Sequence, residues 1–346
     1  MTTMRVAAMA GPQRFEIQEI DQPVAPAGGV LLRVRNCGIC GSDLHFYRGE
    51  FPAMPGLRLG HEIAGEIAAV GDGVEGLAVG QTVAIEPVAV CRRCDFCRRG
   101  DRQLCPERKF VGTQLPGGLG EYLALPAYMA HPLPAGVDCE VGALVEPLAV
   151  AVHGLRLVGL DAGERVAVIG SGTIGLMSIV AAKALGAAAV VATARYPHQR
   201  EAAEALGADA VVEANENATQ AVREAFGGDA PEVVVESVGG HAGTLNQAID
   251  LVRPGGRVSV LGIYTGPQNV NLTGAVLKEA LLIPAITYGS RDGRSDFEIA
   301  LEIAGRRAEE LRRLITHRVA LDDVAQGFAT AADKSQRSIK VTVALS

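Results

Sequence analysis

The segment from Val166 to Gly186 constrains the fold of this chain more than any other stretch. Its sequence, V-A-V-I-G-S-G-T-I-G-L-M-S-I-V-A-A-K-A-L-G, has a short apolar run, then three closely spaced glycines, then a helical apolar pattern. This order predicts a strand, a tight turn and a helix. In such a unit the first glycine makes the turn, the second lets the backbone approach a pyrophosphate, and the third lets the helix pack closely on the strand.

The same segment therefore predicts a dinucleotide-binding site. The start of the expected helix presents free N–H groups and the positive end of the helix dipole to phosphate groups. A strand–helix turn without a ligand is the alternative, because a glycine pattern alone has limited specificity. The candidate cofactor-binding residues of the turn are Gly170, Gly172, Thr173, Ile174 and Gly175.

The composition is typical of a globular α/β protein with about two domains. Of its 346 residues, 48% are hydrophobic and 21% are charged. The net charge of −7 and the lack of a basic stripe argue against a nucleic-acid partner. We find no run of about 18 apolar residues and no secretion-signal pattern, so we expect no membrane partner and a cytoplasmic location.

Residues 151–288 alternate strand and helix patterns, which predicts a Rossmann domain: a doubly wound parallel sheet with helices on both faces. The expected strands span residues 166–169, 189–193, 210–212, 232–236 and 257–261. The expected helices span residues 173–185, 198–206, 217–226 and 242–252.

The remainder of the chain is rich in strand patterns broken by Gly and Pro. After residue 288 the alternation stops, and the pattern favours an amphipathic helix over 294–314 and a strand over 339–345. We expect that last strand to return to the first domain. The prediction is therefore a strand-rich domain of residues 1–150 and 289–346, and a Rossmann domain of residues 151–288.

Four cysteines form a second informative pattern, C-x2-C-x2-C-x7-C, in a lobe of residues 88–106. Four thiolates at this spacing can surround one zinc ion tetrahedrally and leave no position open, as structural zinc sites require. An iron–sulfur cluster is the competing interpretation, but its ligand spacing differs. The pattern also favours a reducing compartment over a disulfide framework. The candidate ligands are Cys91, Cys94, Cys97 and Cys105.

Other possible metal ligands are scattered over three short motifs. These are G-I-C-G-S-D-L-H at residues 38–45, G-H-E at 60–62 and V-E-P-L-A-V-A-V-H at 145–153. An open catalytic zinc site needs three protein ligands of the cysteine, histidine or carboxylate type and one water molecule. The residues alone indicate only that such a set is available.

These five motifs, in this order and spacing, resemble the zinc-dependent medium-chain alcohol and polyol dehydrogenases, and the resemblance to sorbitol dehydrogenase-like members spans the whole chain. It implies that the strand-rich domain is a GroES-like catalytic domain. It further implies reversible oxidation of a secondary alcohol or polyol, such as a sugar alcohol or cyclitol, to a ketone by a homodimer or homotetramer.

The resemblance also implies residue roles. Cys40 and His61 match zinc ligands, and Glu62 or Glu146 matches the third ligand. Ser42 and His45 match a relay that carries the substrate proton to solvent. The residues that follow, Phe46 and Tyr47, are candidates for lining the substrate pocket. The equal alternative is that their rings only pack against neighbouring side chains. Away from the motif positions, we interpret Cys37 and Cys139 as small buried side chains, Asp43 as a structural hydrogen-bonding residue and His153 as structural.

The second Rossmann strand bears on the choice of nicotinamide cofactor. Where NAD-dependent relatives carry Asp, this chain has Ala194, and Arg195 follows it. Without the carboxylate a 2′-phosphate is not repelled, and a guanidinium can bind it. We therefore expect a preference for NADP, with Arg200 as a further contact. The alternative is that Arg195 is a solvated surface charge and NAD is used.

The substrate is less constrained. Polyol dehydrogenases carry an arginine after the last Rossmann strand, and Thr287 takes its place here, unless Arg291 compensates through a shifted alignment. An L-threonine 3-dehydrogenase-like enzyme and a ketone reductase using NAD(H) stay open. The alternative of another class is a non-catalytic, zinc-stabilised NADP(H)-binding protein.

Overall fold

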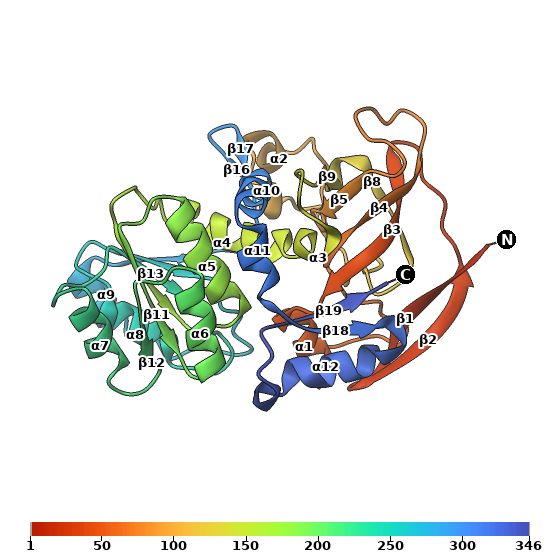
Figure 1. Ribbon diagram of the computed structural model, residues 1–346. Helices are drawn as coiled ribbons and strands as arrows, with labels where there is room; N and C mark the ends of the chain where they lie inside the picture. Colours follow the sequence, from red (N-terminus) through yellow and green to blue (C-terminus); the bar gives the residue numbers. More distant parts are fainter. Residues whose placement is uncertain (1, 346) are drawn as a thin grey trace. The chain divides into compact units, whose positions relative to one another are not determined.

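A computed structural model describes residues 2–345 of the chain (Figure 1). The chain divides into two compact units: unit 1 is Met1–Glu146 with Ser290–Ser346, and unit 2 is Pro147–Gly289. The boundary expected between residues 150 and 151 falls inside a helix, α4 (Val145–Leu157).

Unit 2 is built on a six-stranded parallel sheet. Its strands are β10 (Arg165–Ile169), β11 (Ala189–Ala194), β12 (Ala210–Glu213), β13 (Val233–Glu236), β14 (Arg257–Val260) and β15 (Leu281–Pro284). Besides α4, its helices are α5 (Thr173–Ala184), α6 (Pro197–Ala205), α7 (Ala218–Ala225), α8 (Thr244–Leu251) and α9 (Leu272–Lys278).

The strand order of this sheet is β12-β11-β10-β13-β14-β15, so the direction of winding reverses between β10 and β13. Right-handed crossovers then place α5 and α6 on one face of the sheet and α7, α8 and α9 on the other. The helices pack accordingly, α5 beside α6 and α8 beside both α7 and α9 (Figure 1). The doubly wound fold expected from the sequence is confirmed, and its switch point lies at the carboxyl ends of β10 and β13.

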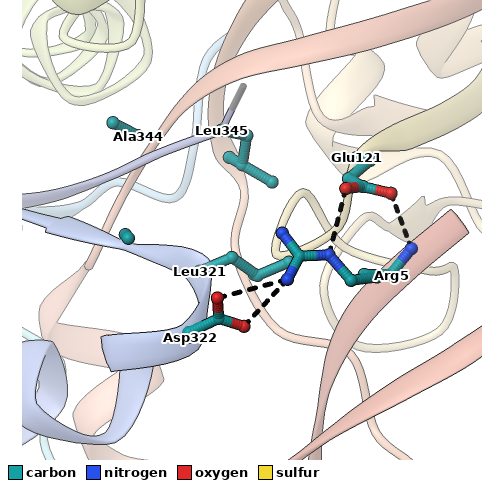
Figure 2. Close-up of a pocket in the computed structure, with 7 residues that line it drawn as sticks. Arg5, Glu121, Leu321, Asp322, Ala344 and Leu345 are labelled. Atoms are coloured by element: carbon teal, nitrogen blue, oxygen red, sulfur yellow. Dashed lines mark hydrogen bonds and ion pairs between the residues drawn. The ribbon is translucent and has the colours of Figure 1, made fainter.

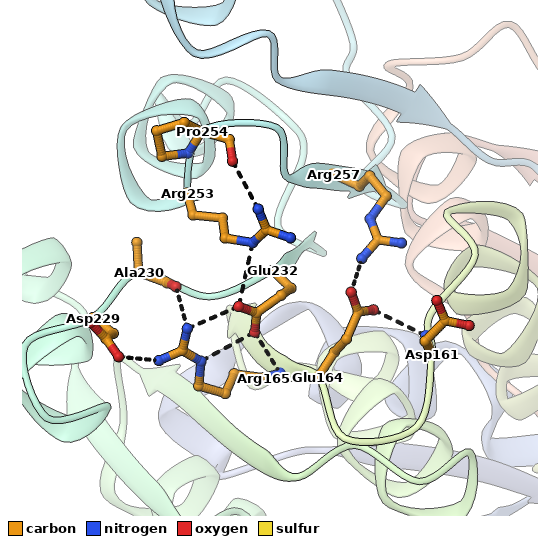
Figure 3. Close-up of polar contacts among 9 residues, drawn as sticks. All are labelled: Asp161, Glu164, Arg165, Asp229, Ala230, Glu232, Arg253, Pro254 and Arg257. Carbon is orange, nitrogen blue, oxygen red and sulfur yellow. Dashed lines mark hydrogen bonds and ion pairs between the residues drawn. The ribbon is translucent and has the colours of Figure 1, made fainter.

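Ion pairs join the opposite, amino ends of the strands (Figure 3). Arg165, the first residue of β10, contacts Glu232 beside β13 through two nitrogens at 2.8 and 3.1 Å, and Asp229 at 2.7 Å. Arg253, before β14, lies 3.3 Å from the same Glu232 carboxylate. One carboxylate thus links three neighbouring strands.

Unit 1 is built on a seven-stranded sheet. Its strands are β3 (Gly29–Gly38), β4 (Glu62–Val70), β5 (Thr82–Ile85), β8 (Tyr122–Pro126), β9 (Ala130–Pro132), β18 (Ile315–Ala320) and β19 (Lys340–Ala344). The tail strand β19 lies between β18 and β3, parallel to the first and antiparallel to the second. The expected return of the tail to the first domain is therefore confirmed.

The other elements of unit 1 lie outside this sheet. The strands are β1 (Thr3–Gly11), β2 (Arg14–Asp21), β6 (Val88–Ala89), β7 (Lys109–Phe110), β16 (Ser290–Arg291) and β17 (Arg294–Ser295). The helices are α1 (Gly41–Arg48), α2 (Asp95–Arg99), α3 (Cys139–Gly142), α10 (Asp296–Arg306), α11 (Ala308–Arg312) and α12 (Val324–Ala332), with 3₁₀ turns η1 (Arg102–Leu104), η2 (Ala127–Met129), η3 (Leu321–Asp323) and η4 (Lys334–Gln336).

Two expectations differ from the structure. The helix expected over 294–314 is two helices, α10 and α11, which meet at Arg307. The alternation of strand and helix also continues through α9 and β15, which the sequence pattern did not reveal. Within residues 2–345, no helix has the length and apolar character needed to cross a membrane.

Candidate active site

The glycine-rich turn lies between β10 and α5, and its glycines have different surroundings. Gly170 has a φ of 92°, a left-handed conformation that favours glycine. A Cβ on Gly175 would lie 1.8 Å from the Gly170 carbonyl oxygen, so only glycine lets α5 approach this closely. A Cβ on Gly172 would meet no atom within 4 Å. The turn thus combines close packing at Gly175 with open space at Gly172, as a pyrophosphate site needs. Thr173 and Ile174 follow as the first residues of α5.

Two side chains that sequence reasoning missed fasten this turn to neighbouring strands. Thr193 Oγ1, near the end of β11, accepts a hydrogen bond of 2.9 Å from the Gly170 amide. Ser237 Oγ, just after β13, lies 2.9 and 3.1 Å from the carbonyl oxygens of Ile169 and Gly170. The strand pattern indicated where these strands end, but an isolated Thr or Ser there belongs to no recognisable motif.

The end of β11 presents the residues expected at the adenosine ribose. Ala194 is buried, and Arg195 is exposed with its guanidinium over the Tyr196 ring, 5.7 Å from Cζ to the ring centroid. Arg200, in contrast, hydrogen-bonds the carbonyl oxygen of Val211. Arg195 is therefore kept as a candidate phosphate ligand, and one guanidinium nitrogen of Arg200 is already engaged within the domain.

The four lobe cysteines come together around η1 and α2. Their sulfur atoms all lie within 4.8 Å of one another, and those of Cys91 and Cys97 are 3.9 Å apart. Sulfur ligands about 2.3 Å from a tetrahedral zinc ion lie about 3.8 Å from one another. The cluster of Cys91, Cys94, Cys97 and Cys105 therefore has the dimensions of a four-thiolate zinc site.

Packing contributes little to the order of the α2 part of this lobe. Its helix α2 has no buried residue, and the Arg93–Glu107 ion pair, at 3.0 Å, is exposed. Hydrogen bonds from the amides of Arg93 and Cys94 lower the pKa of Cys91 to about 7, whereas burial raises that of Cys97 to about 12. A bound cation would favour the thiolate of both, so the residues present fit a structural zinc ion.

A second cluster forms around Cys40, which precedes α1, and His61, which precedes β4. His61 Nδ1 lies 3.4 Å from Asp43 Oδ1, and its Nε2 lies 3.5 Å from Ser42 Oγ. Asp43 also accepts a hydrogen bond of 2.9 Å from the Cys40 amide, so one buried carboxylate orders both segments. Although burial opposes it, the neighbouring Asp43 and Cys40 raise the pKa of His61 well above its ordinary value.

Glu62 is held by a partner that sequence reasoning missed. Both of its carboxylate oxygens lie 2.6 Å from Lys340 Nζ, and both side chains are buried. Lys340 also donates to the Ile39 carbonyl oxygen at 3.1 Å. A Cβ on Gly38 would lie 1.9 Å from Glu62 Oε2, so glycine is required opposite this carboxylate. The sequence feature that could have indicated this partner is that Lys340 is the one charged residue of the tail strand β19.

Glu146 lies in the first turn of α4 and is buried. Burial raises its pKa to about 7, and the charged groups nearest to it include His61, Glu62 and Lys340. Lys340 pairs with Glu62, and Glu146 is the second candidate carboxylate near His61. With Cys40 and His61, either carboxylate would make a thiolate–imidazole–carboxylate set, which suits a catalytic zinc with one open position.

The expected relay residues lie one turn apart on α1. Ser42 and His45 are three residues apart, a spacing that places them on the same helix face. His45 Nδ1 hydrogen-bonds the Glu50 carboxylate, and its ring centroid lies 4.9 Å from that of Phe51. Glu50 was not singled out because a lone carboxylate in a loop has no distinguishing pattern.

The two aromatic pocket candidates are in different places. Phe46 packs edge-on against Phe51, with 5.4 Å between ring centroids. Tyr47 is buried in the core of unit 1, with its ring centroid 6.3 Å from that of Phe15 and 5.4 Å from that of Phe328. The pocket assignment of Tyr47 is therefore corrected: its ring is a core side chain because it faces the inner side of α1.

Two cysteines were expected to be buried and His153 to be structural, and the structure agrees for two of these three residues. Cys37 and His153 are buried. Cys139 is only half-buried, because it begins the short helix α3 at the surface of the unit, so the expectation of full burial is wrong there.

The segment after β15 is conformationally constrained. Thr287 has a φ of 50°, unusual for a β-branched residue, and its buried Oγ1 has no hydrogen-bond partner among residues 2–345. Arg291, the possible replacement for the missing arginine, lies in β16 of unit 1. Backbone strain of this kind is often found at functional positions.

A separate small pocket in unit 1 is lined by Arg5, Glu121, and residues 320–322 and 344–345 (Figure 2). Arg5 lies between two carboxylates, 3.3 Å from Glu121 Oε1 and 3.1 Å from Asp322 Oδ1. The charges that line the pocket are thus paired with one another, and we assign it no ligand.

Comparison with known proteins agrees with this arrangement of sites. Residues 26–135 match the family model of the alcohol dehydrogenase GroES-like domain, and residues 173–305 match that of the zinc-binding dehydrogenases. The chain is also similar in structure to a protein described as a zinc-binding dehydrogenase of Sinorhizobium meliloti bound to NADP. The TM-score is 0.89 and the identity 29%, over 99% of this chain and 100% of the other.

Among curated relatives, a sorbitol dehydrogenase of Halalkalibacterium halodurans is 32% identical over 341 residues, which cover 97% of each chain. An L-threonine 3-dehydrogenase of Pyrococcus abyssi is 36% identical over 277 residues, 79% of each chain. Identity at this level over nearly the full length shows the family. The chain belongs to the zinc-dependent medium-chain polyol dehydrogenases, which are oxidoreductases acting on CH–OH groups.

Proposed function

We propose that this enzyme reversibly oxidises a secondary alcohol or polyol, of the sugar-alcohol or cyclitol type, to a ketone, with hydride transfer to NADP. The observation that carries the proposal is that Cys40 and His61, from distant segments of the chain, interact directly, and that the buried Glu146 interacts electrostatically with His61. A protein that only bound a dinucleotide would not need a partly buried thiol, imidazole and carboxylate at one place.

Two zinc ions per chain are part of the proposal. Cys40, His61 and Glu146 would hold the catalytic ion, and the four lobe cysteines would hold the structural one. When bound, the catalytic zinc supplies a Lewis acid that lowers the pKa of the substrate hydroxyl, and NADP supplies the hydride acceptor.

The chain's own residues orient the ligands and move the proton. Asp43 fixes the His61 ring through Nδ1, and Lys340 holds both oxygens of the Glu62 carboxylate in an ion pair. Ser42, whose Oγ lies 3.5 Å from His61 Nε2, would accept the hydroxyl proton of the substrate. His45, one helical turn later, would release that proton to solvent, a task to which imidazole is suited.

The preference for NADP is supported by two features of β11. Ala194 supplies no carboxylate to repel a 2′-phosphate, and the exposed Arg195 guanidinium follows it directly. We expect kcat/KM for NADP⁺ to exceed that for NAD⁺ by about tenfold or more. Equal or reversed values in initial-rate assays contradict this preference.

A homodimer or homotetramer is supported by the edge of the unit 2 sheet. β15 ends the strand order, so one side of its backbone is unpaired within the sheet. Large apolar side chains beside it are exposed, namely Leu272, Val276, Leu277 and Leu281. Such an apolar edge suits pairing with a second copy of the chain. We also place the enzyme in the cytoplasm, because a four-thiolate zinc site needs reduced cysteines.

The decisive experiment combines zinc analysis with a substrate screen. We expect two zinc ions per chain, and NADP⁺ reduction with at least one member of a panel of polyols, secondary alcohols and aminocyclitols. Glu146→Ala should lose one zinc and turnover, whereas Glu140→Ala, which removes a carboxylate of α3 paired with Arg318, should retain both. One zinc per chain with no turnover across the panel would support the binding protein instead.

L-threonine belongs in the same panel, because the relative from Pyrococcus abyssi is an L-threonine 3-dehydrogenase. Turnover of L-threonine with a kcat/KM well above that of every polyol, and a preference for NAD⁺, would favour that second candidate function.

A further inference from the structure

A fully buried carboxylate lies at the carboxyl end of β13, beside the switch point of the sheet. Glu236 is the last residue of the strand and its exposed fraction is 0%. Across the sheet it is opposite Ile169 of β10, just before the glycine turn, and opposite Val260 of β14. A buried charge in this position is costly unless hydrogen bonds compensate for lost water.

One oxygen of this carboxylate organises the loop after β13. Glu236 Oε1 accepts hydrogen bonds from the amides of Val238 at 2.8 Å and Gly239 at 3.1 Å. It accepts a third, of 2.8 Å, from Thr244 Oγ1 in the first turn of α8. The loop between β13 and α8 is therefore folded around a single oxygen atom.

The other oxygen faces the loop after β14. Glu236 Oε2 is buried and has no hydrogen-bond partner among residues 2–345, and a Cβ on Gly262 would lie 2.4 Å from it. The main-chain carbonyl of Glu236 accepts from the Leu261 and Gly262 amides at 2.8 and 3.1 Å. Burial and the Glu236 charge raise the pKa of the nearby Tyr264 to about 12. Glu236 is thus packed against both loops.

The two loops are also joined directly. The Gly240 amide donates to the Ile263 carbonyl oxygen at 2.7 Å, and a Cβ on Gly239 would lie 2.5 Å from that same oxygen. Ser237, next to Glu236, bonds to the carbonyls that lead into the glycine turn. The loops and the turn therefore form one continuous surface, with the Glu236 carboxylate underneath.

A doubly wound sheet binds one mononucleotide over each half, across its switch point. The glycine turn and Arg195 belong to the half made by β10, β11 and β12, which receives the adenosine side. The nicotinamide side then lies over the loops that follow β13 and β14. We propose that Glu236 is a positioning residue that holds these two loops in the shape that receives the nicotinamide half. This inference rests on the proposed function only in requiring that a nicotinamide dinucleotide binds.

The test separates the two halves of the cofactor. Glu236→Gln keeps the size of the side chain but weakens three charge-assisted hydrogen bonds and places an amide nitrogen against one loop. We expect NADP⁺ and NADPH to bind about tenfold more weakly, while the affinity for 2′,5′-ADP stays within about twofold of wild type. Isothermal titration calorimetry on the zinc-loaded enzyme gives both dissociation constants.

Glu232→Gln is the matched control, because it makes the same substitution at the amino end of the same strand. It should lower Tm and leave both affinities unchanged. Thr244→Val, which removes one donor to Glu236 Oε1, should weaken NADPH binding in the same direction by about threefold. This second variant keeps the test informative if Glu236→Gln is poorly folded.

Unchanged NADPH affinity in Glu236→Gln, or an equal loss for NADPH and 2′,5′-ADP, overturns the inference. Failure of the proposed function would instead be seen in the wild-type enzyme, as an absence of NADP⁺ reduction across the panel of polyols and secondary alcohols. The two failures are therefore distinguishable.

Discussion

Two glycines in the turn before α5 have different roles, one in packing of the fold and one in dinucleotide binding. A Cβ on Gly175 would lie 1.8 Å from the Gly170 carbonyl oxygen, whereas one on Gly172 would meet nothing within 4 Å. We expect Gly175→Ala to destabilise the fold by about 2 kcal/mol or more, because backbone must move. Gly172→Ala should leave Tm unchanged and weaken dinucleotide binding, because its methyl group fills the space for the pyrophosphate. Differential scanning fluorimetry with and without NADPH measures both effects. Equal effects of the two substitutions would contradict this division.

Arg195 and Arg200 also form a matched pair. Arg195→Ala should reduce the ratio of kcat/KM for NADP⁺ to that for NAD⁺ by about 10- to 100-fold, because one charged contact to the 2′-phosphate is lost. Arg200→Ala should lower stability without changing that ratio, because its guanidinium bonds the Val211 carbonyl oxygen. The check is initial-rate kinetics with both cofactors. A loss of selectivity in Arg200→Ala alone would place the phosphate contact there instead.

At this scale, residues inside motifs could be predicted from the sequence, and their partners could not. The four lobe cysteines stand in a recognisable spacing, and Cys40 and His61 stand in motifs that resemble those of the family. Lys340 and Glu236 belong to no recognisable motif, because their contacts are with segments that only the fold brings close to them. The sequence also left Glu62 and Glu146 as equal candidates, and our proposal of Glu146 depends on the ion pair between Lys340 and Glu62.

At the scale of elements, the Glu232 carboxylate couples the amino ends of β10, β13 and β14. Its hydrogen bonds with Arg165 lower its pKa to about 2. A depressed carboxylate pKa stabilises the fold above the unfolded-state value of about 4.3, and that stabilisation is lost as pH falls towards 2. We expect about 1–3 kcal/mol of stability at pH 7 from this source.

Glu232→Gln should therefore lower Tm at pH 7 and reduce the dependence of Tm on pH between about pH 5 and 2. Thermal unfolding followed by circular dichroism over this range tests the expectation. Glu224→Gln, in an exposed part of α7, is the control and should change neither quantity. An undiminished acid dependence in Glu232→Gln would show that other carboxylates dominate it.

The five strands and four helices expected in unit 2 lie within two residues of their expected bounds, because buried valine-rich runs alternate with helices, three of which are closely followed by a glycine. The apolar pattern of the sequence did not predict α9 and β15. α9 is short, contains Gly274 and exposes its apolar residues, and β15 is an edge strand that ends at Pro284. The long helix expected over 294–314 is divided at Arg307, whose φ of −127° lies outside the helical range. Apolar periodicity alone does not reveal such a break.

At the scale of the whole molecule, assembly is expected to depend on the apolar edge of unit 2. Leu277 of α9 is 82% exposed, and such a side chain gains most from burial against a second copy. We expect Leu277→Glu to shift the enzyme to a smaller oligomer or to monomers. Val79→Glu, a control at a 66% exposed apolar site of unit 1, should leave the assembly unchanged. Light scattering after size-exclusion chromatography gives the mass of each. A mass unaltered by Leu277→Glu would place the interface elsewhere.

The position of β19 between β18 and β3 has a consequence for biosynthesis. Glu62 and Lys340 are separated by 278 residues, so the ribosome makes the whole of unit 2 before Lys340 appears. A nascent chain can complete unit 2, which is continuous in sequence, while unit 1 still lacks the strand that joins β18 to β3 and carries Glu62 as an uncompensated charge. We therefore expect ribosome-bound chains that stop before residue 340 to protect unit 2 from protease and leave unit 1 sensitive. The metal-binding half of this enzyme would then mature last, after the half that binds the dinucleotide.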